Sequence, residues 1–435
     1  MKKPLLCALS LICAFTPSRA AERPPNVVFI LSDDHGWQDY GFMGHPHIRT
    51  PHLDRLAAQS LVFPRGYVPT PLCCPSLASI VTGRYPHEHR ITSNDPPHPN
   101  AKTLRAAIDD PGFRAGREKI NGYMRDAATM PRRLATLGYM SLQTGKWWQG
   151  HFSTGGFTHG MSQDDPKRIA RHGDDGLDIG RKTMQPIYDF IAEAQRAEKP
   201  FFVWYAPMLP HQPHQPPERL LAKYRDLAPT LQVAKYWAMV EWFDETCGAL
   251  LTHLDERGLT ENTLVCYVAD NGWIQNPKAD LFDPRSKQSP YDGGLRSPIM
   301  VRWPGKIAPR RSEALASSLD FLPTVMAAAG LKPEAGLPGV SLLDDAAVNA
   351  RTRLFGEVFT HDYVDVASPA SSLRHRWIID GDWKLIVPAP QNEPKRAAEL
   401  FHLADDPEEK SDRIAAEPER AARMREALDA WWVGK

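Results

Sequence analysis

The chain has 435 residues, with 52 Lys and Arg against 52 Asp and Glu, so its formal net charge is zero. This balance gives no sign of the basic surface on which binding to nucleic acid or acidic lipid depends. Six cysteines are too few for a disulfide scaffold in a chain of this length. The length suits one large domain with a smaller one appended.

The first residues are typical of an exported protein. Residues 1–21 begin with two lysines, continue with an apolar run and end in small residues at Ala20 and Ala21. This order predicts a secretory signal peptide that is too short for a lasting membrane anchor. No later segment is apolar enough to span a bilayer, so we expect a periplasmic or secreted protein.

The first structural element is predicted over residues 26–32, NVVFILS. A continuous apolar run rich in β-branched residues fits a central strand that is buried on both faces. Asp33 and Asp34 follow at its carboxyl end, the edge of an open parallel sheet where ligands bind. A helix is expected from Thr50-Pro51, and residues 61–68 are expected to return as a strand.

That strand leads to a segment with two adjacent cysteines, Cys73 and Cys74, between prolines. Pro75 suits the first turn of a helix, so Cys73 is predicted to lie just before a helix N-terminus. Backbone N–H groups and the helix dipole favour an anionic group at such a position. A nucleophile is therefore a natural interpretation of Cys73.

Helices and strands alternate over the following two hundred residues. Residues 101–125 are predicted as loop with helical pieces, and residues 150–176 as a long polar loop. Helices are expected over 129–137, 178–197, 228–257 and 317–330, and strands over 139–144, 201–206, 263–269 and 299–303. The alternation predicts an α/β fold with a mostly parallel central sheet and helices on both faces.

The character of the chain changes beyond about residue 351. Residues 376–387 contain two apolar runs that flank Asp380-Gly381-Asp382, which is a hairpin signal. A short strand over 400–403 and an amphipathic helix over 417–432 follow. We therefore divide the chain into a signal peptide (1–21), an α/β domain (22–350) and a small α+β subdomain with an antiparallel sheet (351–435).

Polar pairs follow two of the buried strands: Asp33 and Asp34 after the first, Asp270 and Asn271 after the strand over 263–269. If these strands are neighbours, the four side chains converge at one edge of the sheet. Carboxylates with an amide oxygen suit Ca²⁺ or Mg²⁺. One pair alone would as readily be a turn or a helix cap, but two pairs and the cysteine segment favour a metal site.

The cysteine segment resembles the signature of the sulfatase family in the alkaline-phosphatase superfamily. That signature is Cys or Ser, any residue, Pro, a small residue and Arg, then an apolar stretch that ends in Thr-Gly-Arg. Cys73, Pro75, Ser76 and residues 82–84 match in register, and Leu77 stands where the family has Arg. The resemblance implies that a formylglycine-generating or sulfatase-maturing enzyme oxidises Cys73 to formylglycine, whose hydrate attacks sulfur.

The resemblance also implies roles for polar residues elsewhere. Asp33, Asp34, Asp270 and Asn271, with the oxygen at residue 73, would bind one divalent cation, Ca²⁺ or Mg²⁺.

Lys146 in Thr-Gly-Lys-Trp and Lys287, four residues before Tyr-Asp-Gly-Gly-Leu-Arg, would contact the sulfate group. His211 in Pro-His-Gln-Pro would act as an acid near the bridging oxygen. Trp148 stands where the family usually has His.

Two features leave alternatives open. The segment 150–176, which carries His151, His159, Arg171 and His172, would either line a pocket for an anionic sugar or form a mobile surface loop. Cys247 and Cys266 would either pair in an oxidising compartment or remain buried apolar thiols.

The leading interpretation is an exported, cation-dependent sulfatase that acts on a sulfated carbohydrate and has no nucleic-acid partner. Two alternatives keep the fold: a non-catalytic binder of sulfated glycans, and a phosphodiester or phosphonate hydrolase. Sulfate and phosphate esters are both tetrahedral anions, so only measured turnover of each ester would distinguish the two activities.

Overall fold

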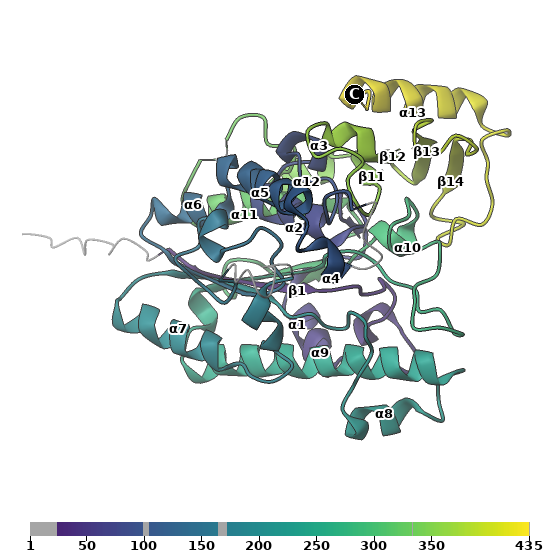
Figure 1. Ribbon diagram of the computed structural model, residues 1–435. Helices are drawn as coiled ribbons and strands as arrows, with labels where there is room; N and C mark the ends of the chain where they lie inside the picture. Colours follow the sequence, from purple (N-terminus) through teal and green to yellow (C-terminus); the bar gives the residue numbers. More distant parts are fainter. Residues whose placement is uncertain (1–23, 99–103, 164–171, 333, 435) are drawn as a thin grey trace, which may run out of the picture.

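The computed structural model describes residues 24–98, 104–163, 172–332 and 334–434, so the expected signal peptide lies outside the described residues. Figure 1 shows a central sheet almost edge-on, with helices above and below it and a second sheet near the C-terminus. The predicted α/β architecture with an additional antiparallel sheet is confirmed.

The central sheet has the strand order β5-β4-β6-β1-β7-β8-β2-β9. Strand β1 runs parallel to both of its neighbours, β6 and β7, and β4 runs parallel to β6. Strand β8 is antiparallel to β7 and β2, so one side of the sheet is mixed. The bounds are β1 Asn26–Ser32, β2 Leu61–Phe63, β4 Met140–Gly145, β5 His159–Gly160, β6 Phe201–Ala206, β7 Thr263–Ala269, β8 Ile299–Arg302 and β9 Arg310–Arg311.

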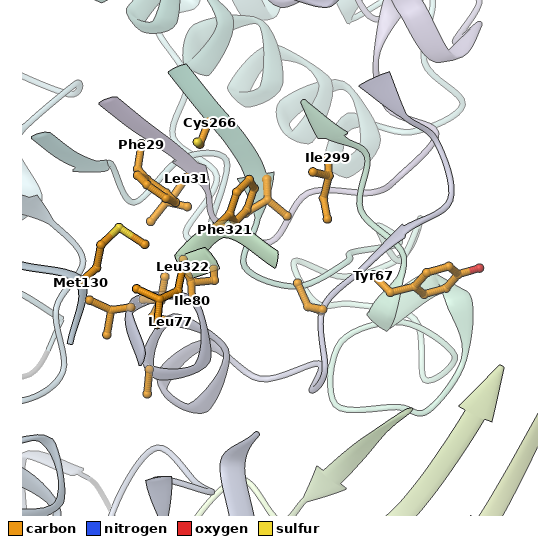
Figure 2. Packing of buried hydrophobic residues seen from close by; sticks show 14 of the residues in the cluster. Phe29, Leu31, Tyr67, Leu77, Ile80, Met130, Cys266, Ile299, Phe321 and Leu322 are labelled. Carbon is orange, nitrogen blue, oxygen red and sulfur yellow. The ribbon is translucent and has the colours of Figure 1, made fainter. Parts of the chain in front are cut away.

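Both faces of β1 are buried, which explains its uninterrupted apolar sequence. Val27, Phe29 and Leu31 face one core, whereas Val28 and Ile30 face the other. Figure 2 shows Phe29 and Leu31 packed among side chains of the helices on the first face, and the rings of Phe29 and Phe321 lie 5.2 Å apart.

Two groups of helices cover the sheet. On the face that Figure 2 shows lie α2 (Cys73–Thr82), α3 (Pro86–His89), α5 (Pro111–Asp126), α6 (Met130–Ala135), α11 (Phe321–Ala328) and α12 (Asp345–Ala350). On the other face lie α1 (Pro51–Ala58), α7 (Gln185–Arg196) and the long α9 (Leu231–Glu256), with α8 (Glu218–Tyr224) packed on α9. Short helices α4 (Leu104–Ala107) and α10 (Asp292–Leu295) lie between these elements.

Four predicted segments differ from the structure. The helix expected over 178–197 begins only at Gln185 (α7), because residues 180–182 form a turn. Residues 111–126 form a regular helix, α5, because Asp110 caps it by accepting a hydrogen bond from the Phe113 backbone N–H at 2.8 Å. The strand expected over 61–68 is split into β2 and β3 (Gly66–Tyr67), and β3 pairs with β10 (Ala316–Ser317) in a separate small sheet. The described part of 150–176 includes the edge strand β5 and two 3₁₀ turns, so it is not structureless.

The C-terminal part forms a four-stranded antiparallel sheet from β11 (Arg353–Phe359), β12 (Leu373–Asp380), β13 (Trp383–Pro388) and β14 (Glu399–His402). The predicted hairpin is β12–β13, in which Asp380 pairs with Trp383. Helix α13 (Pro418–Trp431) covers one face of this sheet. The opposite face, which includes Trp377, joins the core of the large domain.

Cys247 and Cys266 are free and buried on opposite faces of the central sheet. The disulfide alternative is therefore wrong, because the sheet separates the two thiols. Among the described residues, no helix combines the length and the apolarity needed to cross a membrane.

Candidate active site

The polar pairs after β1 and β7 meet at one edge of the sheet because the two strands are parallel neighbours. The backbone N–H of Asp270 donates to the carbonyl of Ser32 at 2.9 Å, which extends the pairing beyond the strands. The backbone N–H of Asp34 donates to Asp270 Oδ1 at 3.1 Å. Asp33, Asp34, Asp270 and Asn271 are all buried.

Asp34 is the most heavily paired of these carboxylates. Asn271 Nδ2 donates to its Oδ1 at 2.7 Å, and Lys287 Nζ lies 2.7 Å from it. His211 Nε2 lies 3.4 Å from Oδ2. Burial raises the pKa of Asp34, but Lys287, His211 and Lys146 outweigh it, and the net pKa lies well below the usual range. Asp34 is therefore ionised at any pH of interest.

Lys146, which follows β4, contacts the other two carboxylates, Asp33 and Asp270. Its Nζ lies 2.6 Å from Asp33 Oδ1 and 3.4 Å from Asp270 Oδ2. Burial raises the pKa of Asp270 to about 7, and the neighbouring charge of Asp33 adds to this rise. Burial also raises the pKa of Asp33 above its usual value despite the contact with Lys146. Three carboxylates thus compete for two ammonium groups inside the protein.

Cys73 is the first residue of α2, one position further into the helix than predicted, and Pro75 lies in the first turn as expected. Its Sγ lies 3.5 Å from Asn271 Oδ1, which places the thiol against the carboxylate cluster. Burial raises the pKa of the thiol to about 12, although Lys146 and Lys287 lower it. Leu77 packs in the apolar core instead of facing the polar site (Figure 2).

His211 lies beside the cluster, after β6. Its Nδ1 donates to the backbone carbonyl of Gln212, and its Nε2 faces Asp34. Burial lowers the pKa of His211 to about 3, even though the charge of Asp34 raises it. The ring is thus held with Nε2 directed at the cluster.

The carboxylate oxygens of the cluster suit a hard divalent cation, whereas a thiol sulfur is not a usual ligand of one. Oxygen, sulfur and nitrogen ligand atoms of Asp33, Asp34, Cys73 and His211 lie within 4.8 Å of one another. The Oδ2 atom of Asp33 is buried and has no hydrogen-bond partner, which is costly unless a positive charge lies beside it. Asp270 lies next to this group, where its two oxygens already contact Asp34 and Lys146.

Only part of the segment 150–176 reaches the site. His151 contacts Ser153, and His159 pairs with Glu193 on α7 at 3.4 Å, both away from the cluster. His172 lies with its ring 4.3 Å from Trp148 and 6.4 Å from His211. Arg171 lies outside the described residues.

The residues that support the cysteine pair were not predicted from the sequence. Asn94 accepts a hydrogen bond from the backbone N–H of Cys74 at 3.1 Å, and Gln149 Nε2 donates to Cys74 Sγ at 3.2 Å. Arg117 on α5 donates to the carbonyls of Asn94 and Trp148. These residues lie in or reach toward irregular segments, where no periodic pattern marks them.

Comparison with known proteins decides the family. Residues 25–331 match the model of the family described as Sulfatase. The chain belongs to the sulfatase family. Residues 279–430 also match the model described as N-sulphoglucosamine sulphohydrolase, C-terminal. Hydrolysis of sulfate esters is accordingly the reaction class of this sulfatase.

Individual relatives agree with this assignment. The sulfatase is 27% identical to N-acetylgalactosamine-6-sulfatase of Canis lupus familiaris, over 92% of this chain and 84% of that protein. It is 32% identical to arylsulfatase A of Homo sapiens, over 77% and 69%. The crystal structure of Ps i-CgsB in complex with k-i-k-neocarrahexaose has a TM-score of 0.75 and 23% identity, over 95% and 94%.

Proposed function

We propose that this sulfatase hydrolyses a sulfate ester of a carbohydrate at residue 73, with one divalent cation held at the carboxylate cluster. The observation that carries the proposal is the buried charge set: three carboxylates and two ammonium groups surround the thiol of Cys73. A structural core does not need such a set, because buried ion pairs seldom stabilise a fold more than apolar side chains would.

The cation site that we propose uses Asp33, Asp34, Asn271 and the group at residue 73, with Asp270 alongside. The unpartnered Oδ2 of Asp33 supports this, because it lacks the partner that a cation would supply. A bound Ca²⁺ or Mg²⁺ would polarise the sulfate oxygens and stabilise negative charge there.

The charges favour a monoanionic substrate. With all groups ionised, the three carboxylates exceed the two lysines by one negative charge, and a divalent cation would turn this into one positive charge. A sulfate monoester carries a single negative charge and would leave the buried site neutral. Lys146 and Lys287 would hold its oxygens by charge-assisted hydrogen bonds. A doubly charged phosphate monoester would leave the buried site with one excess negative charge.

Cys73 itself is a poor nucleophile in this setting. A buried thiol with a pKa of about 12 is almost entirely protonated at neutral pH. Oxidation of Cys73 to formylglycine would replace it with an aldehyde, whose hydrate supplies the oxygen nucleophile. Because Cys73 is 1% exposed in the folded chain, the maturing enzyme would act before folding is complete.

His211 would assist departure of the alcohol. Its Nδ1 is committed to the Gln212 carbonyl, so Nε2 is the nitrogen that remains directed at the reacting group. Protonation of Nε2 would let it donate a hydrogen bond to the bridging oxygen, which would stabilise charge as the ester bond breaks.

The carbohydrate class rests on relatives whose names state their substrates, including N-acetylgalactosamine-6-sulfatase. The N-terminal residues begin with two lysines, continue with an apolar run and end in small residues, which supports export to a compartment where such glycans occur. We place the enzyme outside the cytoplasm on that basis.

Mass spectrometry of the tryptic peptide 66–84, combined with turnover of sulfate esters, tests the proposal. We expect an aldehyde at Cys73 in protein made in its native host, loss of turnover in Cys73→Ala and retained turnover in the matched Cys74→Ala variant. Two unmodified thiols in native-host protein would overturn the formylglycine mechanism. Faster turnover of a phosphodiester or phosphonate than of any sulfate ester would instead support the hydrolase of phosphorus esters.

A further inference from the structure

The segment that leaves the end of β4 returns to the same point at His172. The backbone N–H of Trp147 donates to the His172 carbonyl at 3.4 Å. At Gly173, an added Cβ would lie 2.1 Å from the carbonyl oxygen of Gly145, so the two backbones are in close contact. His172 is therefore anchored to the strand end that carries Lys146.

The backbone at this return is unusual. His172, Gly173 and Asp174 have φ values of 70°, 108° and 49°, three consecutive residues with positive φ. Such conformations cost free energy in non-glycine residues and persist where the surroundings enforce them, often at functional sites. They coincide with the close approach of Gly173 to the Gly145 carbonyl.

The His172 ring lies beside the rings of Trp148 and His211, next to the polar cluster. It meets the Trp148 ring edge to face at 4.3 Å and 89°. Trp148 is 1% exposed, and Lys146 Nζ lies 5.9 Å from its ring centroid. The buried Trp148 ring is therefore close to both His172 and Lys146, the lysine that we propose holds the sulfate group. His172 itself is only half-buried and accessible from outside.

The distance from His172 to His211 suits a shared ligand atom. The ring centroids are 6.4 Å apart with the planes inclined at 58°. An oxygen atom within hydrogen-bond distance of a nitrogen of each ring, about 2.8 Å, spans a comparable separation. His211 uses Nδ1 for the Gln212 carbonyl, so a second imidazole adds a donor that His211 alone does not offer.

We infer that His172 is a second substrate-contacting residue, which donates a proton to the bridging oxygen between it and His211. This rests on the proposed function. As the nucleophilic oxygen at residue 73 bonds to sulfur, the bond from sulfur to the bridging oxygen breaks and its electron pair stays on that oxygen. The oxygen takes the proton of the His172 imidazolium, and the proton that the attacking hydrate oxygen releases to solvent restores the protonated ring. Histidine ordinarily exchanges protons near neutral pH.

A series of substituted phenyl sulfates with increasingly basic leaving groups tests this, using formylglycine-containing protein. An acidic phenol leaves without a proton, whereas a basic one needs it. We expect His172→Gln to match the wild-type kcat/KM for the most acidic phenol and to fall about 100-fold below it for the least acidic one. His151→Gln, in the same segment but away from the site, should follow the wild type throughout.

The dependence of the activity loss on the leaving group distinguishes a proton donor from a structural residue. An equal loss across the whole series, or no loss at all, would overturn the role of His172, because a purely structural residue does not distinguish leaving groups. Thermal unfolding and formylglycine content of each variant exclude folding or maturation as the cause of a graded loss. If the formylglycine-containing wild type hydrolyses neither phenyl sulfates nor sulfated carbohydrates, the proposed function fails. If the wild type is active but His172→Gln shows no graded loss, only the role of His172 fails.

Discussion

The ammonium group of Lys287 lies 2.7 Å from each of the two carboxylate oxygens of Asp34. Both side chains are buried, at 8% and 0% exposure, so the pair is shielded from solvent. The contact joins the end of β1 to a segment more than 250 residues later in the chain. Removal of one partner would leave the other as an unpaired buried charge.

Lys287→Met should destabilise the metal-free protein by about 3 kcal/mol or more, the cost of breaking a buried ion pair from one side. Urea unfolding measures this change. The double variant Lys287→Met/Asp34→Asn should recover much of the stability but no sulfatase activity, since neither the sulfate contact nor the cation ligand returns. Lys278→Met, at an exposed position nearby, is the control and should change neither quantity. If Lys287→Met proved as stable as the control Lys278→Met, the prediction would be contradicted.

Gly173→Ala should lower activity more than its backbone strain explains. Gly173 and Gly138 both have positive φ, but an added Cβ at Gly138 meets nothing within 4 Å, whereas at Gly173 it would strike Gly145. Alanine costs about 1 kcal/mol at either position from φ alone. We expect Gly138→Ala to keep full kcat and Gly173→Ala to lose at least about tenfold, because the return to β4 must shift. Steady-state kinetics and thermal unfolding, measured on both variants, decide the question.

Calcium or magnesium added to the metal-free protein should raise its stability, because a ligand that binds only the folded state stabilises it by about 2.7 kcal/mol at one hundred times its Kd. Asp33→Asn should weaken cation binding at least about tenfold, since it removes the charge next to the unpartnered oxygen. Calorimetric titration measures the Kd. Asp226→Asn at an exposed position serves as the matched control, and a Kd unaffected by Asp33→Asn would place the cation elsewhere.

Cation affinity should fall as the pH drops through about 7, because the proton on Asp270, whose pKa burial raises to about 7, competes with the cation. The metal-free protein should behave in the opposite way. A carboxyl group with a folded pKa above its unfolded value contributes stability at low pH, and that contribution is lost as the pH rises through 7. Unfolding measured from pH 5 to 8 with and without cation tests both signs, and Asp270→Asn should flatten both curves.

The predicted strands over residues 26–32, 201–206 and 263–269 have the bounds seen in the structure, because each is buried on both faces and its apolar run has clear ends. Helix α5 was not predicted as a continuous helix. It contains three glycines and few apolar residues, so its stability comes from the Asp110 cap and from packing of one narrow face. Propensity alone does not reveal such a helix.

The candidate site also contains residues whose positions could be predicted from the sequence and residues whose positions could not. The placement of Asp33, Asp34, Asp270 and Asn271 at strand ends could be predicted, since parallel strands present their carboxyl ends at one edge. The approach of His172 could not, because it depends on a contact between the backbones of Gly173 and Gly145.

By itself, the sequence determined the α/β class, the position of Cys73 at a helix N-terminus and the acidic edge of the sheet, because these follow from local hydrophobic pattern and strand direction. Only the tertiary structure decided which charges pair, which histidine of the segment 150–176 reaches the site and that Cys247 and Cys266 lie on opposite faces. Those features arise from distances through space between segments far apart in the chain, and no local pattern encodes such distances.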